Sequence, residues 1–283
     1  MRIAAAAALA AGCASPHAPR PAGLAQASAA QEAALAARTA SRLDAALAEE
    51  ERPPAERARD AYTHPRDTLL FFGLRPQQTV LEAWPASGYY TAIIAPVLAA
   101  GGRYYAAELP ADASSRFVSG MRDRLQLRLA AHPERYERVE LTAFGPHAIE
   151  PAPAGSVDLA LALCTLHDWL AEGWAPQALA ALHRALRPGG VLGVVDHRGD
   201  PARPQDPRAR SGYVQEAYAV QLIEAAGFRL LARSELNANP RDTRDYPQGV
   251  WTLPPTYRLG ERDRARYAAI GESDRFTLKF LRP

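Results

Sequence analysis

The segment that most constrains the fold is 79–91, T-V-L-E-A-W-P-A-S-G-Y-Y-T. Its start predicts a short buried strand that ends on the carboxylate of Glu82, and Gly88 closes a turn before a helix begins. A second strand, Arg103–Glu108, also ends on an acid, Glu108. A strand, a glycine turn, a helix N-terminus and a second strand with a terminal acid are typical of the corner at which doubly wound α/β sheets bind nucleosides.

Strands and helices alternate after this corner, which predicts parallel strands with helices on both faces. Together with the first two strands, the pattern gives one sheet of seven strands, the others being expected at Val139–Phe144, Val157–Leu163, Val191–Asp196, Phe228–Leu236 and Arg275–Leu281. The intervening helices are expected at Ser115–Ala131, Pro176–Leu186 and Val214–Ala226. The fourth and fifth strands are almost wholly apolar, as strands buried on both faces should be.

A helical extension is expected before the sheet. Alanine-rich residues 31–51 carry leucines at helical spacing, and 55–72 predicts a further helix that is interrupted at His64-Pro65. The expected organisation is a signal at 1–13, a disordered tether at 14–30, the helical extension at 31–76 and the α/β domain at 77–283.

The charge composition argues against nucleic acid as a partner. The net charge is only +2, and no basic run stands out among the 33 basic residues, of which Lys279 is the single lysine. The seven histidines are scattered, and no His/Cys/Asp spacing resembles a zinc site, so no metal is expected. Apolar residues make up 48% of the chain, which is ample for a core.

The first residues have the pattern of an export signal. Arg2 precedes an apolar run, and Gly12-Cys13 follows it. Cleavage before Cys13 resembles the bacterial lipoprotein signal, in which that cysteine is acylated, although Ala10 stands where leucine is usual. A periplasmic or membrane-anchored lipoprotein is therefore expected, touching the membrane only through its lipid. A plain secretory signal and a cytosolic alanine-rich tail are the alternatives.

The corner resembles motif I of the class I S-adenosylmethionine-dependent methyltransferases, [DE]-x-G-x-G-x-G. On that motif Glu82 is the acid, and Trp84, Ala86 and Gly88 take the glycine positions. The chain is closer to an exported branch of that superfamily with the pattern E-x-W-P-G-G-G-[WY]-Y-T. The resemblance covers roughly residues 50–283 and continues in A-R-D-A-Y-x-H-P (58–65), F-F-G-L-R-P (71–76), L-R-P-G-G-V-L-G-V-V-D-H-R (186–198) and S-D-R-F-T-L-K-F (273–280).

The resemblance implies a Rossmann-like, doubly wound sheet of seven strands with an antiparallel last strand. It also implies that S-adenosyl-L-methionine is the cofactor, with Glu82 near its methionine end and Glu108 on the ribose hydroxyls. The adenine edge is expected at the end of the third strand, with Ala143, Phe144 and Gly145 as candidates, and core packing is the alternative for Phe144. Trp84 and Ala86 each add a side chain where the family has none, so Trp84 must turn away from the ligand or close over it.

The segment C-T-L-H-D-W (164–169) follows the fourth strand, whose tip lines the meeting point of methyl donor and acceptor in the family. His167 is a candidate general base because its reference pKa is about 6.5. Asp168 is a candidate to orient it, only indirectly, since adjacent side chains diverge. The alternative is that both simply begin the next helix, with Trp169 in the core. His197 is a weaker candidate of the same kind.

Two functions compete. The first is a methyltransferase acting on a small-molecule acceptor, with the long segment 237–272 as a lid or acceptor wall. Its arginines Arg241, Arg244 and Arg258 suit either an acidic acceptor or a solvated surface. The second is a non-catalytic binding module of the same fold at the cell envelope, favoured by the altered glycine turn and by an export signal that would separate the chain from a cytosolic metabolite. A nicotinamide enzyme is disfavoured, because the turn lacks G-x-G-x-x-G. No oligomeric state is predicted.

The export interpretation predicts an acylated N-terminal cysteine. Mass analysis of membrane fractions should find the chain beginning at lipidated Cys13, and Cys13→Ala should abolish the modification because the acyl group is attached to that thiol. A soluble protein that begins at Met1 would contradict the prediction.

Overall fold

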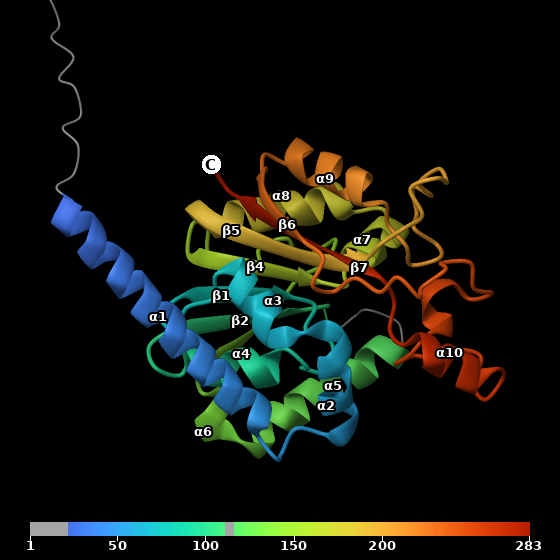
Figure 1. Ribbon diagram of the computed structural model, residues 1–283, viewed down its shortest axis with the longest axis horizontal. Helices are drawn as coiled ribbons and strands as arrows, with labels where there is room; N and C mark the ends of the chain where they lie inside the picture. The colour runs from blue at the N-terminus through green and yellow to red at the C-terminus, as the bar shows by residue number, and fades with distance from the viewer. Residues whose placement is uncertain (1–21, 111–115) are drawn as a thin grey trace, which may run out of the picture. The chain divides into compact units, whose positions relative to one another are not determined.

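The computed structural model describes residues 22–110 and 116–283, so the predicted signal, Cys13 and the first part of the tether lie outside the described residues. The described residues up to Leu35 are assigned to one unit and residues 36–283 to a second, compact one. The second unit holds the sheet, which is shown with its helices in Figure 1.

The sheet has seven strands in the order β3-β2-β1-β4-β5-β7-β6. β1 pairs in parallel with β2 and β4, whereas β7 runs antiparallel between β5 and β6. This confirms the predicted doubly wound sheet and its antiparallel last strand. The strands are β1 (Thr79–Ala83), β2 (Arg103–Glu108), β3 (Val139–Ala143), β4 (Val157–Leu163), β5 (Leu186–His197), β6 (Arg229–Ser234) and β7 (Arg275–Leu281).

Helices cover both faces of the sheet because alternate strand residues face opposite ways. Leu81 of β1 packs in the cluster that contains α7–α9, and its neighbour Val80 packs in the cluster that contains α3 and α4 (Figure 1). The helices are α1 (Ala22–Ala48), α2 (Pro54–Thr63), α3 (Pro65–Phe72), α4 (Thr91–Leu98), α5 (Arg116–Ala131), α6 (Pro133–Tyr136), α7 (Leu166–Glu172), α8 (Ala175–Ala185), α9 (Glu216–Ala225) and α10 (Arg264–Ile270).

Helix α1 begins at Ala22, inside the stretch 14–30 where the tether is expected. Alanine has the highest helix propensity of the residues, and the alanine-rich sequence continues back to this point. The predicted break at His64-Pro65 is confirmed, because His64 takes a left-handed conformation (φ 38°, ψ 54°) between α2 and α3. In the described part of the chain, no helix has the length and apolarity needed to cross a bilayer.

Strand β5 begins earlier than the sequence indicates. Residues 186–190 carry the Pro-Gly-Gly signal of a turn and were expected to end the preceding helix, but they extend the strand from Leu186. The amide of Gly189 donates to the carbonyl of Arg282 at 2.8 Å, and the amide of Arg282 donates to the carbonyl of Gly190 at 2.9 Å. Hydrogen bonds with the end of the chain therefore hold this turn sequence in the ladder.

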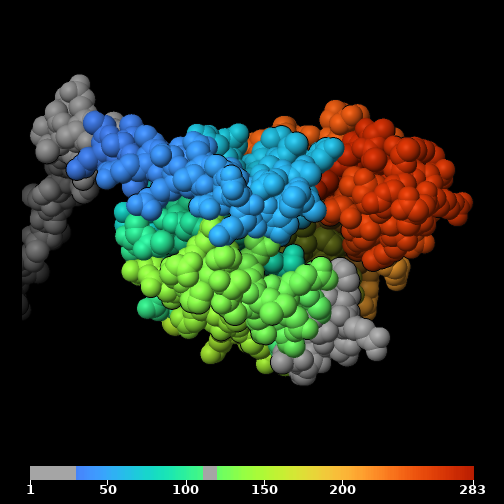
Figure 2. All heavy atoms as spheres, turned by 90° about the horizontal axis from the view of Figure 1, so that it is seen from below, coloured from blue at the N-terminus to red at the C-terminus, as the bar shows by residue number. Residues whose placement is uncertain are grey.

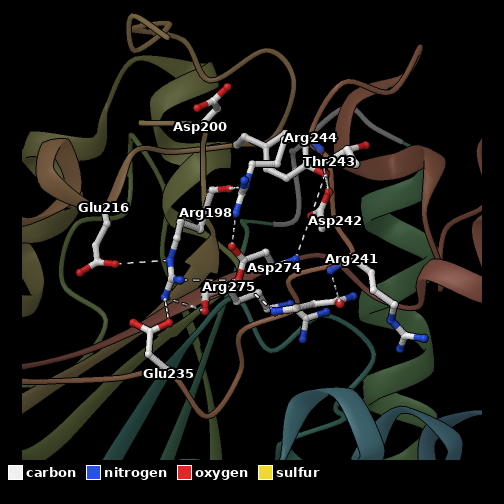
Figure 3. Close-up of polar contacts among 12 residues, drawn as sticks. Arg198, Asp200, Glu216, Glu235, Arg241, Asp242, Thr243, Arg244, Asp274 and Arg275 are labelled. Atoms are coloured by element: carbon white, nitrogen blue, oxygen red, sulfur yellow. Dashed lines mark hydrogen bonds and ion pairs between the residues drawn. The ribbon is translucent and has the colours of Figure 1, made fainter. Parts of the chain in front are cut away.

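The segment between β6 and β7 is fixed by buried polar contacts (Figure 3). Asp242 accepts hydrogen bonds from the amides of Arg244 (2.9 Å) and Asp274 (2.8 Å), and the hydroxyl of Tyr213 donates to it at 3.0 Å. Arg198, just after β5, pairs with Asp274 at 3.7 Å. A short 3-10 turn, η1 (Gly249–Thr252), and α10 lie within this segment, which is therefore an ordered wall of the protein.

Packing between α3 and the sheet predicts a sensitive position. A Cβ added to Gly193 of β5 would lie 2.6 Å from the ring of Phe72, which is 1% exposed. Gly193→Ala should therefore lower the free energy of unfolding by about 1–3 kcal/mol, measured by urea denaturation.

Gly120→Ala is the matched control, because an added Cβ there has no neighbour closer than 3.9 Å. Since Gly120 lies in helix α5, this change should leave stability unchanged or raise it by up to about 1 kcal/mol. Equal effects of the two substitutions would contradict the packing argument.

Candidate active site

A cavity of about 390 Å³ opens at the edge where the parallel strands end. Its lining includes the last residues of β1, β2, β4 and β5 and the first residue of β7, which is antiparallel and so begins at this edge. Figure 2 views the surface where the helices that follow α1 (light blue), the α5 region (green) and the segment before β7 (red) border a recess. The strand order reverses between β1 and β4, and ligands of doubly wound sheets bind at such a reversal.

The turn after β1 keeps a glycine-like backbone without the glycines. Trp84 and Ala86 both have φ of 54°, and Gly88 has φ of 86°. Left-handed conformations cost non-glycine residues roughly 1–2 kcal/mol each. Cys164, at the tip of β4, also has a positive φ (58°) and, like Trp84 and Ala86, lines the cavity. Backbone strain of this kind concentrates at functional sites, which supports this cavity as the site.

The indole of Trp84 does not fill the hollow. Its Nε1–H donates to the carbonyl of Phe144 at 2.8 Å, and its ring centroid lies 5.7 Å from that of Trp174 and 6.1 Å from that of Trp169. These contacts direct the ring into the aromatic cluster beside α7, so that only part of it borders the cavity. Of the two arrangements open to Trp84, the structure shows it turned aside.

Phe144 and Gly88 have structural roles beside the cavity. Phe144 is fully buried in the core, does not line the cavity and uses its carbonyl for Trp84, so the structure gives it no contact with a ligand. A Cβ on Gly88 would lie 2.8 Å from Leu125 of α5, so close packing of α5 as well as the positive φ requires glycine there. Neither residue therefore belongs to the cavity wall.

Glu82 lies at the floor of the cavity and is 3% exposed. Its Oε2 accepts hydrogen bonds from the hydroxyls of Thr91 (3.2 Å) and Tyr104. Its Oε1 has no hydrogen-bond partner within the described residues and remains available to a ligand. Burial raises the pKa of Glu82 to about 7, against the opposing effect of the two hydroxyl donors.

Glu108 ends β2 and lines the same cavity at 9% exposure. Across the described residues its carboxylate makes no hydrogen bond. Burial raises its pKa to about 7, and the nearby guanidinium of Arg122 only partly opposes this. A nearly buried carboxylate without a donor is suited to accept hydrogen bonds from a pair of ligand hydroxyls.

His167 is oriented by a residue that the sequence analysis did not assign to it. Its Nδ1 lies 2.8 Å from Oδ1 of Asp196, and its backbone amide donates to Oδ2 at 3.0 Å. Burial alone would lower the pKa of His167, but Asp196 and Asp168 outweigh it and raise the pKa to about 9. Its Nε2 lies 3.5 Å from Asp168 Oδ1, closer than expected for adjacent residues. At neutral pH His167 is therefore an imidazolium held against Asp196.

His197 stands beside this pair, with its ring centroid 5.0 Å from that of His167. Burial and the charge of His167 hold its pKa well below the usual value, so it is neutral. Donor atoms of His167, Asp196 and His197 all lie within 4.8 Å of one another, a grouping that linear spacing did not reveal. Both oxygens of Asp196 already accept hydrogen bonds, from His167 and from the amide of His197 (2.7 Å), so Asp196 acts here as an orienting group.

The arginines at the cavity are not those expected from the sequence. Arg244 donates to the carbonyl of Arg198 at 3.0 Å (Figure 3), and Arg241 donates to that of Ala269 at 3.1 Å. Both therefore hold the wall segment. Arg258 lies over the ring of Trp251 at 4.5 Å. The cavity is instead lined by Arg59, Arg122 and Arg275.

Comparisons with solved structures identify proteins of similar architecture. A SAM dependent methyltransferase from Aquifex aeolicus matches with a TM-score of 0.55 and 17% identity, over 80% of this chain and 93% of that one. The [4+2]-cyclase SpnF matches with a TM-score of 0.55 and 17% identity, over 83% of this chain and 85% of that one. The Haemonchus contortus phosphoethanolamine N-methyltransferase 2 in complex with S-adenosyl-L-methionine matches with a TM-score of 0.52 and 15% identity, over 78% of this chain and 53% of that one.

This chain has the class I methyltransferase fold. No protein-family model matches the sequence, and no curated protein matches it significantly. Identities of 17% and below establish the fold alone, and the presence of a cyclase among the neighbours illustrates that the fold does not dictate one reaction.

The cavity residues fit an adenosyl cofactor. The free Oε1 of Glu82 and the unpaired carboxylate of Glu108 stand at the ends of neighbouring strands, next to a turn whose backbone adopts the left-handed conformation. The volume of about 390 Å³ lies within the usual range for small-molecule sites.

The raised pKa of Glu82 predicts a pH-dependent cost in stability. A folded-state pKa of about 7 lies above the reference value of 4.5, so the folded protein loses stability as the pH rises from 4.5 through 7. Glu82→Gln keeps an oxygen for Tyr104 and removes the charge. At pH 8 the variant should be more stable than wild type by on the order of 1–3 kcal/mol, and near pH 4.5 the two should be equal.

Urea unfolding across this pH range measures the effect. Glu140→Gln is the control, because Glu140 is an exposed carboxylate on β3 and its loss should change stability by less than about 0.5 kcal/mol. A variant less stable than wild type at pH 8 would show that the ionised Glu82 stabilises the fold.

Proposed function

We propose that this protein is an S-adenosylmethionine-dependent methyltransferase acting on a small-molecule acceptor. The observation that carries the proposal is the pair of nearly buried carboxylates, Glu82 and Glu108, at adjacent strand ends of a preserved cavity. Glu108 accepts hydrogen bonds from the two ribose hydroxyls, and Oε1 of Glu82 accepts one from the amino group of the methionine moiety. Trp84 and Ala86 supply the turn beside it.

The sulfonium of the cofactor supplies a methyl group that is open to in-line displacement. The chain contributes position and the exclusion of water, which together can lower a barrier by on the order of 7–11 kcal/mol. Its wall segment brings Trp251 to within 6.0 Å of His167 between ring centroids, which shields the β4 tip from solvent. His167 is an imidazolium at the β4 tip, and Asp196 fixes its orientation through Nδ1. Asp168 adds a second carboxylate at Nε2.

The second candidate is a non-catalytic binding module of the same fold. The side chains of Trp84 and Ala86 favour it, because each adds atoms to a turn where the relatives in the resemblance have none. The proposed location is the cell envelope, through acylation of Cys13, and this applies to both candidates. The enzyme requires the cofactor, and the binding module does not.

Calorimetric titration with S-adenosylhomocysteine, the demethylated product, tests the proposal. Wild-type protein should bind it, and Glu108→Ala should weaken binding by about 1–3 kcal/mol, since a buried carboxylate would lose its hydrogen bonds to the ribose. Glu140→Ala on the neighbouring strand β3 is the matched control and should bind as wild type does.

Absence of binding at millimolar ligand would favour the binding module. An affinity unchanged by Glu108→Ala would remove Glu108 from the site while leaving the cofactor in place.

A further inference from the structure

Two guanidinium groups at one end of the cavity share a single carboxylate. Nε of Arg59 lies 2.7 Å from Oε1 of Glu272, and the NH2 group of Arg59 lies 3.2 Å from Oε2 of the same carboxylate. Arg275 donates to the same Oε2 through its NH2 group. The side chains of Arg275 and Glu272 are 4% and 2% exposed, and that of Arg59 is 30% exposed.

This cluster carries one uncompensated positive charge. Burial would raise the pKa of Glu272, but Arg275 and Arg59 hold it below its usual value, so the cluster has two cations and one anion. The neighbouring thiol of Cys164 adds no negative charge, because burial raises its pKa to about 12. Among the neighbouring charges, His167 is balanced by Asp196, and Asp168 lies 3.5 Å from His167 Nε2 and forms no ion pair with Arg59 or Arg275 among the described residues.

Arg275 also has hydrogen-bonding capacity that the protein does not use. Its Nε is buried and has no partner, and neither its NH1 group nor that of Arg59 donates to any of the described residues. Buried charges normally persist only when they are paired. A buried cation with unused donors, lining a cavity, points to an anionic ligand group.

The position of Arg275 separates it from the proposed ribose end of the cofactor site. Arg275 begins β7, and Glu108 ends β2, with β1, β4 and β5 between them in the sheet. At roughly 4.8 Å per strand, the two tips are about 19 Å apart. Arg275 therefore lies beyond the β4 tip and lines the same cavity as the wall residues Trp251 and Pro255.

We propose that Arg59 and Arg275 form a carboxylate-binding subsite for the methyl acceptor, which is therefore a small organic acid. A single carboxylate balances the one excess charge and matches the planar forks of the two guanidinium groups. The identification of the bound acid as a methyl acceptor rests on the proposed methyl transfer. The carboxylate subsite itself rests only on the arginine cluster.

Ligand-observed NMR titration with benzoate and benzamide tests the subsite, because the two probes have similar shape and differ in charge. Benzoate should bind at least about tenfold more tightly than benzamide, and Arg59→Gln should abolish this preference. Arg57→Gln, two residues earlier on α2 at an exposed position, is the matched control and should retain it. Glu272→Gln should increase benzoate affinity severalfold, because it removes the shared counter-charge; this variant decides the question if Arg59→Gln does not fold.

A repeat of the titration with saturating S-adenosylhomocysteine identifies the source of the carboxylate. Benzoate should still bind, whereas its displacement would assign the subsite to the methionine arm of the cofactor and overturn the proposal. Equal binding of benzoate and benzamide, or an unchanged preference in Arg59→Gln, would overturn it too. Preferential benzoate binding by a protein that does not bind S-adenosylhomocysteine would uphold the subsite and refute the methyltransferase.

Discussion

The hydrogen bond from Nε1 of Trp84 to the carbonyl of Phe144 is the interaction on which the cavity depends. A tryptophan at this position of the turn has to place its indole either in the crevice between β1 and β4 or in the neighbouring core. An unpaired buried N–H would cost roughly 1–3 kcal/mol, so the 2.8 Å bond to Phe144 and the rings of Trp169 and Trp174 together stabilise the second position. The crevice remains open as a result.

The cavity collects features that work against stability. It contains three strained non-glycine residues (Trp84, Ala86 and Cys164) and two carboxylates whose pKa values burial raises to about 7. A fold selected only for stability would replace a buried carboxylate at the end of a strand with an apolar or amide side chain. The concentration of these strained residues and buried carboxylates at the point where the strand order reverses is better explained by the demands of a ligand.

The sequence was sufficient for the seven strands and for the positions of Glu82 and Glu108, because these depend on local alternation and on residues at strand ends. The antiparallel last strand followed from the family resemblance. The sequence was insufficient where a partner comes from a distant part of the chain. The carboxylate that orients His167 is 29 residues away, and Arg59 meets Glu272 across 213 residues. Phe144 was left open between the adenine edge and the core, because an aromatic residue at a strand end has the same pattern whether it lines a cavity or fills the core.

The antiparallel direction of β7 explains why the acceptor end of the cavity differs from the cofactor end. β7 begins where its neighbours end, so Arg275 and the wall segment before it reach the ligand edge from the opposite direction. The same Glu272 that holds Arg275 also holds Arg59 of α2, whose guanidinium lies 5.0 Å from the ring of Tyr89. Tyr89 follows directly on Gly88 of the cofactor turn. The charged cluster at one end of the cavity and the strained turn at the other therefore belong to one continuous set of contacts, although different strands supply them.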